Sequence, residues 1–210
     1  MLENTSKKPC LVILELSSID VNNTPKWNEE KLNVLYPYYN SEKYVRELLS
    51  DVVDSKELLM IKVSGLYRHN SNVLSYLKWM TNGFLQASFD GYVPLYKKWN
   101  ESIKQEKVHE EITHKKKLEY IDKFIDLCKH EGINLVFAVS PNYKLLPKRQ
   151  KWVDELEKIA NRKDIAFYYH EKDSLFLSHR EWFNEPFHLN DTGAKEYTRL
   201  MIPFLKENLN

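Results

Sequence analysis

The sequence has few residues of the kinds that define specialised protein classes. Its 2 cysteines and 5 glycines among 210 residues are too few for a disulfide framework or a collagen-like repeat. Lys plus Arg total 31 against 30 for Asp plus Glu, so no overall field attracts a nucleic acid partner. Apolar runs are too short for a membrane span or a signal segment. As written, the chain is expected to be cytoplasmic, with Cys10 and Cys128 as buried thiols.

What the sequence does contain is an alternation of apolar strands and amphipathic helices. Residues 10–16 and 133–139 are apolar runs typical of strands in a parallel sheet, and residues 165–169 provide a third. Helical periodicity lies between these runs and again from Asp191 onward, and Gly132 is placed to end one helix. The pattern predicts an α/β fold, a three-layer α/β/α sandwich with a parallel sheet of the flavodoxin-like kind.

A second region interrupts this alternation. We interpret roughly residues 41–100 as a helical insertion within a single α/β domain that spans residues 1–210. Helical patterns occur at 41–53 after Ser41 as N-cap, near 55–67 and at 71–81. The following residues mix Gly and Pro with aromatics, which predicts an irregular loop that packs through Phe84, Tyr92 and Tyr96.

Polar side chains follow each predicted strand, where ligands of open parallel sheets bind. The candidate site residues are Ser17, Ser18 and Asp20 after the first strand, Asn142 and Tyr143 after the second, and Glu185, His188 and Asn190 in the loop at 170–190 after the third. We expect Asp20, Asn142, Tyr143 and Asn190 to contact substrate.

His188 is the strongest catalytic candidate among them. It immediately precedes a helix whose N-cap is Asn190 or Asp191, so it stands at the functional edge of the sheet. A histidine there can act as a general base, and Glu185 three residues earlier can hold its Nδ1 hydrogen. The structural alternative is an ion pair that only pins the loop.

The segment from Glu185 to His188, continuing as Leu189-Asn190-Asp191-Thr192-Gly193-Ala194, resembles the last block of the SGNH/GDSL hydrolase superfamily, with Glu in place of Asp. Residues 63–71 and 91–95 also look like segments of its bacterial members that act on surface polysaccharide. The resemblance implies an ester hydrolase or acyl transferase for an O-acylated carbohydrate, without cofactor or metal. It also allows an exported or periplasmic location.

The serine block of that family has no counterpart here, because no Gly-x-Ser precedes any predicted helix. Residues 9–20 look instead like the third block of the family, with Ser17 at the glycine position and Ile19 at the asparagine position. The resemblance therefore implies a chain without the first two strands and without a nucleophile. A competing interpretation makes Ser17 or Ser18 the nucleophile, and a simpler one has both serines capping the turn.

Two functions thus remain open from the sequence. One is catalysis with His188 as base and Glu185 as its orienting carboxylate. The other is a non-catalytic scaffold that serves as a binding module, forming a homodimer through the edge of the strand at 11–16. A zinc site at His109 and His114 is rejected, since the two histidines are five positions apart and would lie on different sides of a helix.

Overall fold

The computed structural model describes residues 8–22, 32–70, 92–100, 112–143 and 150–208. The chain divides into two compact units, and we call residues 1–23 with 94–210 the first unit and residues 24–93 the second unit. The second unit overlaps the insertion expected at 41–100, with both boundaries closer to the N-terminus. The expectation of a single domain stays a prediction.

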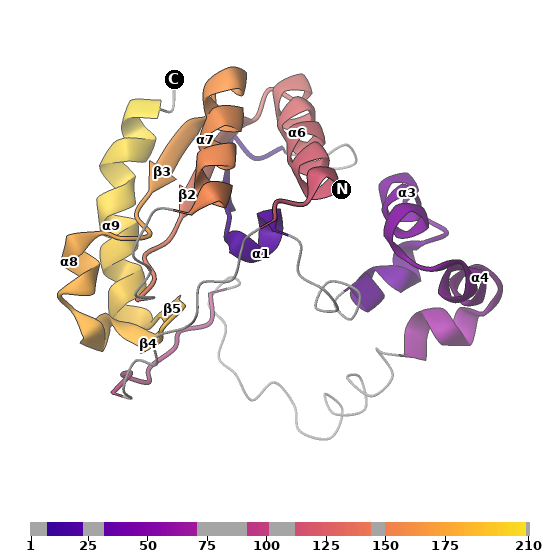
Figure 1. Ribbon diagram of the computed structural model, residues 1–210, viewed down its shortest axis with the longest axis horizontal. Helices are drawn as coiled ribbons and strands as arrows, with labels where there is room; N and C mark the ends of the chain where they lie inside the picture. The colour runs from indigo at the N-terminus through magenta and orange to yellow at the C-terminus, as the bar shows by residue number, and fades with distance from the viewer. Residues whose placement is uncertain (1–7, 23–31, 71–91, 101–111, 144–149, 209–210) are drawn as a thin grey trace. The chain divides into compact units, whose positions relative to one another are not determined.

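Among the described residues of the first unit, three parallel strands form a sheet (Figure 1). β1 (Leu11–Glu15), β2 (Asn134–Val139) and β3 (Ala166–Tyr169) lie in the order β1-β2-β3. β2 is buried at every residue after Asn134, because strands and helices surround it. Continuous apolar sequence suits such a strand, and the predicted α/β fold with a parallel sheet is confirmed.

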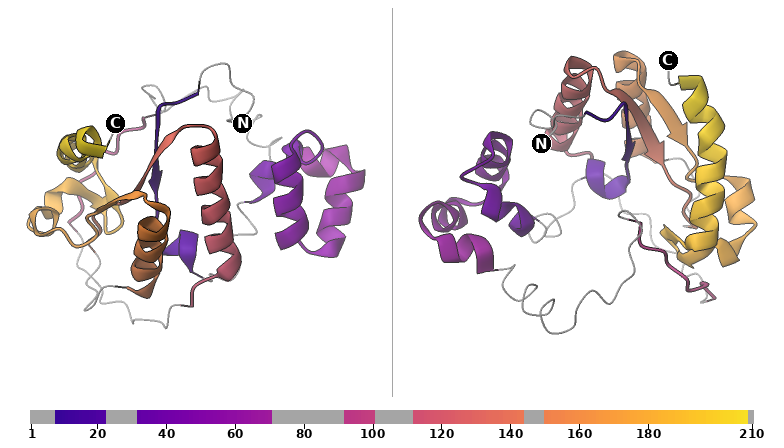
Figure 2. Two further views of the ribbon diagram at one scale, coloured as in Figure 1. Left: turned by 90° about the horizontal axis from the view of Figure 1, so that it is seen from above. Right: turned by 180° about the vertical axis from the view of Figure 1, so that it is seen from behind.

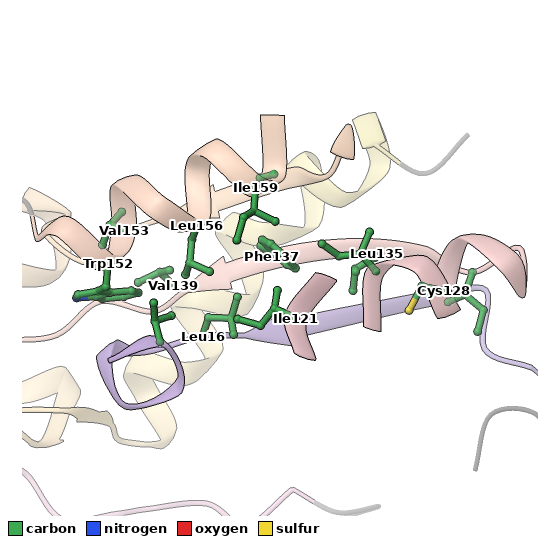
Figure 3. Packing of buried hydrophobic residues seen from close by; sticks show 14 residues of the cluster. Leu16, Ile121, Cys128, Leu135, Phe137, Val139, Trp152, Val153, Leu156 and Ile159 are labelled. Carbon is green, nitrogen blue, oxygen red and sulfur yellow. The ribbon is translucent and has the colours of Figure 1, made fainter. Parts of the chain in front are cut away.

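Two helices, α6 (Lys115–His130) and α7 (Lys151–Lys163), pack on one face of this sheet. Each helix repeats apolar residues every three or four positions, which gathers them into one buried stripe. Alternate residues of β2 meet both stripes (Figure 3). The labelled cluster comprises Leu16, Ile121, Cys128, Leu135, Phe137, Val139, Trp152, Val153, Leu156 and Ile159.

The last helix, α9 (Asp191–Asn208), covers the other face. Ala138 of β2 and Tyr168 of β3 belong to a separate buried cluster with Tyr197 and Met201 of α9. Figure 2 shows α9 on one side of the sheet and α6 with α7 on the other. In the part of the first unit that the structure describes, α6 and α7 thus cover one face of the sheet and α9 covers the other.

Helix ends in the first unit follow local backbone chemistry. Gly132 has a φ of +67°, and its N–H donates to the carbonyl of Lys129 at 3.2 Å, so it ends α6 as predicted. Asp164 ends α7 with a φ of 52°, a conformation that aspartate tolerates better than most residues.

The long loop predicted after β3 is instead built from short elements, which corrects that expectation. α8 (Ser174–Leu177) and a 3₁₀ helix, η3 (Arg180–Trp182), lead into an antiparallel hairpin of β4 (Phe183–Glu185) and β5 (His188–Leu189). Elements of two to four residues are too short to produce a hydrophobic period, so the sequence pattern does not distinguish them from loop.

The second unit contains a 3₁₀ helix, η2 (Asn33–Tyr38), followed by α3 (Lys43–Val52) and α4 (Ser55–Val63). The two α-helices confirm two of the three predicted helical patterns, although Glu42 rather than Ser41 is the N-cap of α3. The third pattern, 71–81, lies outside the described residues. Tyr36 donates a hydrogen bond of 2.6 Å to Glu57, and burial raises the pKa of this phenol.

Three side chains expected to be buried are exposed. Cys10 is exposed because it precedes an edge strand, whereas Cys128 is buried and its thiol pKa is raised by desolvation. Tyr96 is 73% exposed and Tyr92 is 40% exposed, so neither side chain is buried as expected. Trp99 supplies the buried aromatic contact of that segment instead, while Phe84 lies outside the described residues.

β1 is an edge strand of the described sheet. Its Ile13 side chain is 41% exposed, and no described strand pairs with its outer side. An unpaired edge offers backbone groups to another strand. A homodimer through this edge nevertheless stays a prediction.

Candidate functional site

The β4–β5 hairpin places the two strongest candidates side by side. Glu185 and His188 are paired residues across the hairpin, and Oε1 of Glu185 contacts Nδ1 of His188. The side chains are 48% and 65% exposed, respectively. A carboxylate at Nδ1 favours the tautomer whose Nε2 accepts a proton. The arrangement therefore has the geometry of an oriented general base on an open surface.

Backbone hydrogen bonds and aromatic rings hold this hairpin in place. The N–H of Trp99 donates to the carbonyl of Phe183 at 2.8 Å, and the N–H of Tyr143 donates to that of Pro186 at 2.8 Å. The Tyr143 ring lies edge-on to Trp99 and to Phe183, with centroid distances of 5.2 and 5.3 Å. Tyr143, expected to contact substrate, thus has a supporting role under the hairpin.

Asn190 connects the hairpin to α9. Its Oδ1 accepts from the N–H of Gly193 at 3.1 Å, which makes Asn190, rather than Asp191, the N-cap among the two residues that the sequence offers. Its Nδ2 donates to the carbonyl of Glu181 at 2.7 Å. Asn190 is buried, and both ends of its amide are occupied, so its predicted contact with substrate has no support from this geometry.

Ser17 and Asp20 form a capping pair at α1 (Ser18–Val21) rather than a site with His188. The Ser17 hydroxyl donates to Oδ2 of Asp20 at 2.7 Å, and the Ser17 N–H donates to the same oxygen at 2.8 Å. Within the described residues, no hydrogen bond joins Ser17 or Ser18 to His188. This is the capping role that the simpler interpretation assigns to Ser17.

Asn142 lies at the carboxyl end of β2 beside a buried carboxylate. Its Nδ2 donates to Oε1 of Glu171 at 3.0 Å, while the Tyr169 hydroxyl donates to Oε2 at 2.9 Å. Glu171 is almost fully buried, so these donors satisfy a group that would otherwise be costly. The contact therefore gives Asn142 a structural role.

The sequence pattern missed a second histidine–carboxylate pair. Nδ1 of His170 lies 2.6 Å from Oδ2 of Asp173, directly after β3. These side chains are only 25% and 20% exposed, less than those of His188 and Glu185. The signal was present as the spacing His-x-x-Asp immediately after a predicted strand, the reverse order of Glu-x-x-His.

Glu15 is a titratable residue at the carboxyl end of β1. Its Oε1 accepts from the N–H of Ser140 at 2.7 Å. Desolvation raises the pKa of Glu15, and repulsion from Asp20 adds to this, while hydrogen bonds from Ser140 oppose it. Burial also raises the pKa of Tyr197 on α9, with Glu15 contributing in the same direction.

Replacing Glu15 by glutamine tests the sign of this shift. Because the pKa of Glu15 in the folded chain lies above its ordinary value of 4.5, the contribution of Glu15 to stability is greatest below pH 4.5 and is lost as pH rises through the folded-state pKa. Glu15→Gln should therefore raise the denaturation midpoint at pH 7, and the gain should vanish near pH 4. Urea denaturation across this range measures the difference.

Glu131→Gln is the control of opposite sign. Hydrogen bonds from Lys8 and His130 lower the pKa of Glu131, so its stabilising effect is present above 4.5 and is lost as pH falls. This variant should be less stable than the wild type at pH 7 and match it at low pH. Equal pH profiles for the two variants would contradict the shift assigned to Glu15.

Residues 109–111 of the rejected zinc motif lie outside the described residues, and the described His, Cys, Asp and Glu side chains include no group of three placed to hold a metal ion. None of the described helices combines the length and apolar composition that crossing a membrane requires.

Comparisons of the chain with protein-family models, curated proteins and solved structures give no significant match.

Proposed function

We propose that this chain is an SGNH-like ester hydrolase or acyl transferase that acts on an O-acylated carbohydrate, with His188 as general base. The observation that supports it is the contact between Nδ1 of His188 and Glu185, which orients an exposed imidazole. In the same proposal, β1, β2 and β3 correspond to the last three strands of an SGNH sandwich. The sequence likeness at 185–194 supports that correspondence.

The nucleophile is the point at which the proposal departs from a serine hydrolase. Ser17 already donates its hydroxyl hydrogen to Asp20, and the described residues place no serine hydroxyl against His188. We therefore propose direct general-base catalysis. Nε2 of His188 takes a proton from water or from an acceptor hydroxyl. At the same time, the oxygen of that water or hydroxyl adds to the ester carbonyl. The carbon–oxygen ester bond then breaks, and the alkoxide leaving group receives the proton from the imidazolium.

Glu185 is a positioning residue in this scheme. Its carboxylate holds the tautomer and stabilises the positive charge that develops on His188. Because both side chains are largely exposed, water screens part of this stabilisation. We expect a modest rate enhancement unless a bound substrate covers the pair.

The alternative is a non-catalytic scaffold that acts as a binding module. The capping role of Ser17 favours it, because an SGNH fold without a free serine cannot form an acyl-enzyme. The same feature is compatible with direct general-base catalysis. Activity of His188 variants separates the two candidates.

Hydrolysis of p-nitrophenyl acetate by the purified full chain is the test. His188→Ala should lower the enzyme-dependent rate by about 10²-fold or more, because the proton acceptor is lost. Glu185→Gln should cause a smaller loss and shift the pH profile, since the imidazole keeps its place but loses the carboxylate charge. Ser17→Ala should retain most of the activity.

His130→Ala is the matched control, because His130 also lies beside a carboxylate, at 3.1 Å from Glu131, and is highly exposed on α6. It should hydrolyse the ester at the wild-type rate. Equal rates for wild type and His188→Ala would reject catalysis and favour the scaffold. A loss in Ser17→Ala as large as that in His188→Ala would restore Ser17 as the nucleophile.

A further inference from the structure

Arg180 lies in η3, and no described residue provides a counter-ion for its guanidinium. Its Nε and Nη2 atoms are buried and form no hydrogen bond. The guanidinium carbon lies 4.2 Å from the centroid of the Trp99 ring. This cation–π contact stabilises the face of the guanidinium, but the ring cannot accept the N–H groups that point outward in its plane. A buried edge of this kind is unfavourable until an acceptor occupies it.

The shape of the unpaired edge indicates the acceptor. Nε and Nη2 form one side of a planar fork whose two N–H groups match the two oxygens of a carboxylate. One guanidinium balances one negative charge, which is the charge of a carboxylate and less than that of a phosphate monoester. The unpaired edge of Arg180 therefore fits a carboxylate best.

The position of Arg180 connects this edge to the candidate catalytic pair. Trp99, on which Arg180 stacks, donates its N–H to Phe183 of β4 and packs against Tyr143. Tyr143 in turn donates its N–H to Pro186, in the turn between Glu185 and His188. Trp99, which contacts Arg180, is thus also one of the residues that hold the hairpin.

We propose that the Nε–Nη2 edge of Arg180 binds a carboxylate of the substrate, so that the chain acts on an acidic carbohydrate ester. The assignment to a substrate rests on the proposed function, whereas carboxylate binding itself does not depend on catalysis. Because the edge is covered in the free chain, the surrounding side chains must shift to admit the ligand. Binding should therefore change tryptophan fluorescence through Trp99.

Isothermal titration of the full chain with sodium glucuronate, sodium acetate and glucose tests the proposal. Glucuronate should bind, acetate should bind more weakly, and glucose should show no binding. Arg180→Gln should weaken glucuronate binding by about tenfold or more, because both charge-assisted hydrogen bonds are lost. Arg180→Lys keeps the charge without the fork and should also bind more weakly than the wild type.

Arg199→Gln is the matched control, because Arg199 is an exposed arginine of α9 that pairs with Glu196 at 2.8 Å. Its affinity for glucuronate should equal that of the wild type. Thermal midpoints identify folded variants, and Arg180→Lys decides the outcome if Arg180→Gln is unfolded.

Wild-type affinity in a folded Arg180 variant, or no binding of either carboxylate by the wild type, would overturn the proposal. Binding of acetate without binding of glucuronate would overturn the assignment to a substrate. The site would then recognise a small acid of the kind that ester hydrolysis releases. Arg180-dependent glucuronate binding together with equal ester hydrolysis by wild type and His188→Ala would support the carboxylate site and reject the catalytic function.

Discussion

Replacing Gly193 by alanine is expected to destabilise the first unit by about 3 kcal/mol, the upper part of the usual cost of overpacking. A Cβ at this position would lie 2.3 Å from the backbone oxygen of Trp182 and 3.1 Å from Cδ2 of Leu189. That oxygen cannot easily move, because it accepts the N–H of Asn190 at 2.9 Å. The first turn of α9 would have to separate from the hairpin. Chemical denaturation followed by circular dichroism measures the loss.

Gly132→Ala is the matched control for this prediction. Gly132 has a φ of +67°, but no atom lies within 4 Å of a Cβ built there, so only backbone strain opposes the alanine. That strain costs about 1 kcal/mol. Equal losses in the two variants would show that Gly193 is not required for close contact between α9 and the hairpin.

Replacing Phe137 by alanine is expected to cost about 4 kcal/mol, within the range for large-to-small changes at buried aromatic positions. Phe137 is fully buried in the central strand β2 and belongs to the cluster between the sheet, α6 and α7. Its removal would leave a cavity that residues of three elements line, and such a site collapses poorly. Urea denaturation of the variant gives the free energy of unfolding to compare with the wild type.

Ile13→Ala tests whether burial explains the effect at Phe137. Ile13 stands on the edge strand β1 and is 41% exposed, so its truncation should cost less than about 1 kcal/mol. A loss at Ile13 similar to the loss at Phe137 would contradict the view that burial explains the difference between the two positions.

The candidate site was predictable only in part. The spacing of Glu185 and His188 and the cap at Asn190 follow from local sequence, because the pair is three positions apart and the cap adjoins the helix. The hairpin that pairs Glu185 with His188 depends on Trp99, which is more than eighty residues away in the chain. The local sequence does not predict a contact between residues that are so far apart in the chain.

Arg180 and the pair His170–Asp173 were missed for a related reason. Whether an arginine has a counter-ion, or a histidine is sheltered, depends on which segments surround it after folding. Conversely, the sequence left open whether Ser17 is a nucleophile or a cap, and the helical turn of α1 places Asp20 against its hydroxyl.

The sequence by itself determined the order of β1, α6, β2, α7, β3 and α9, because burial on one or two faces requires apolar residues at periods that can be read directly. It also determined where α6 ends and α9 begins, since Gly132 and Asn190 act through their own local backbone. Only the tertiary structure decided which polar groups meet. Those contacts join residues distant in the chain, and their energies depend on burial that no single segment specifies.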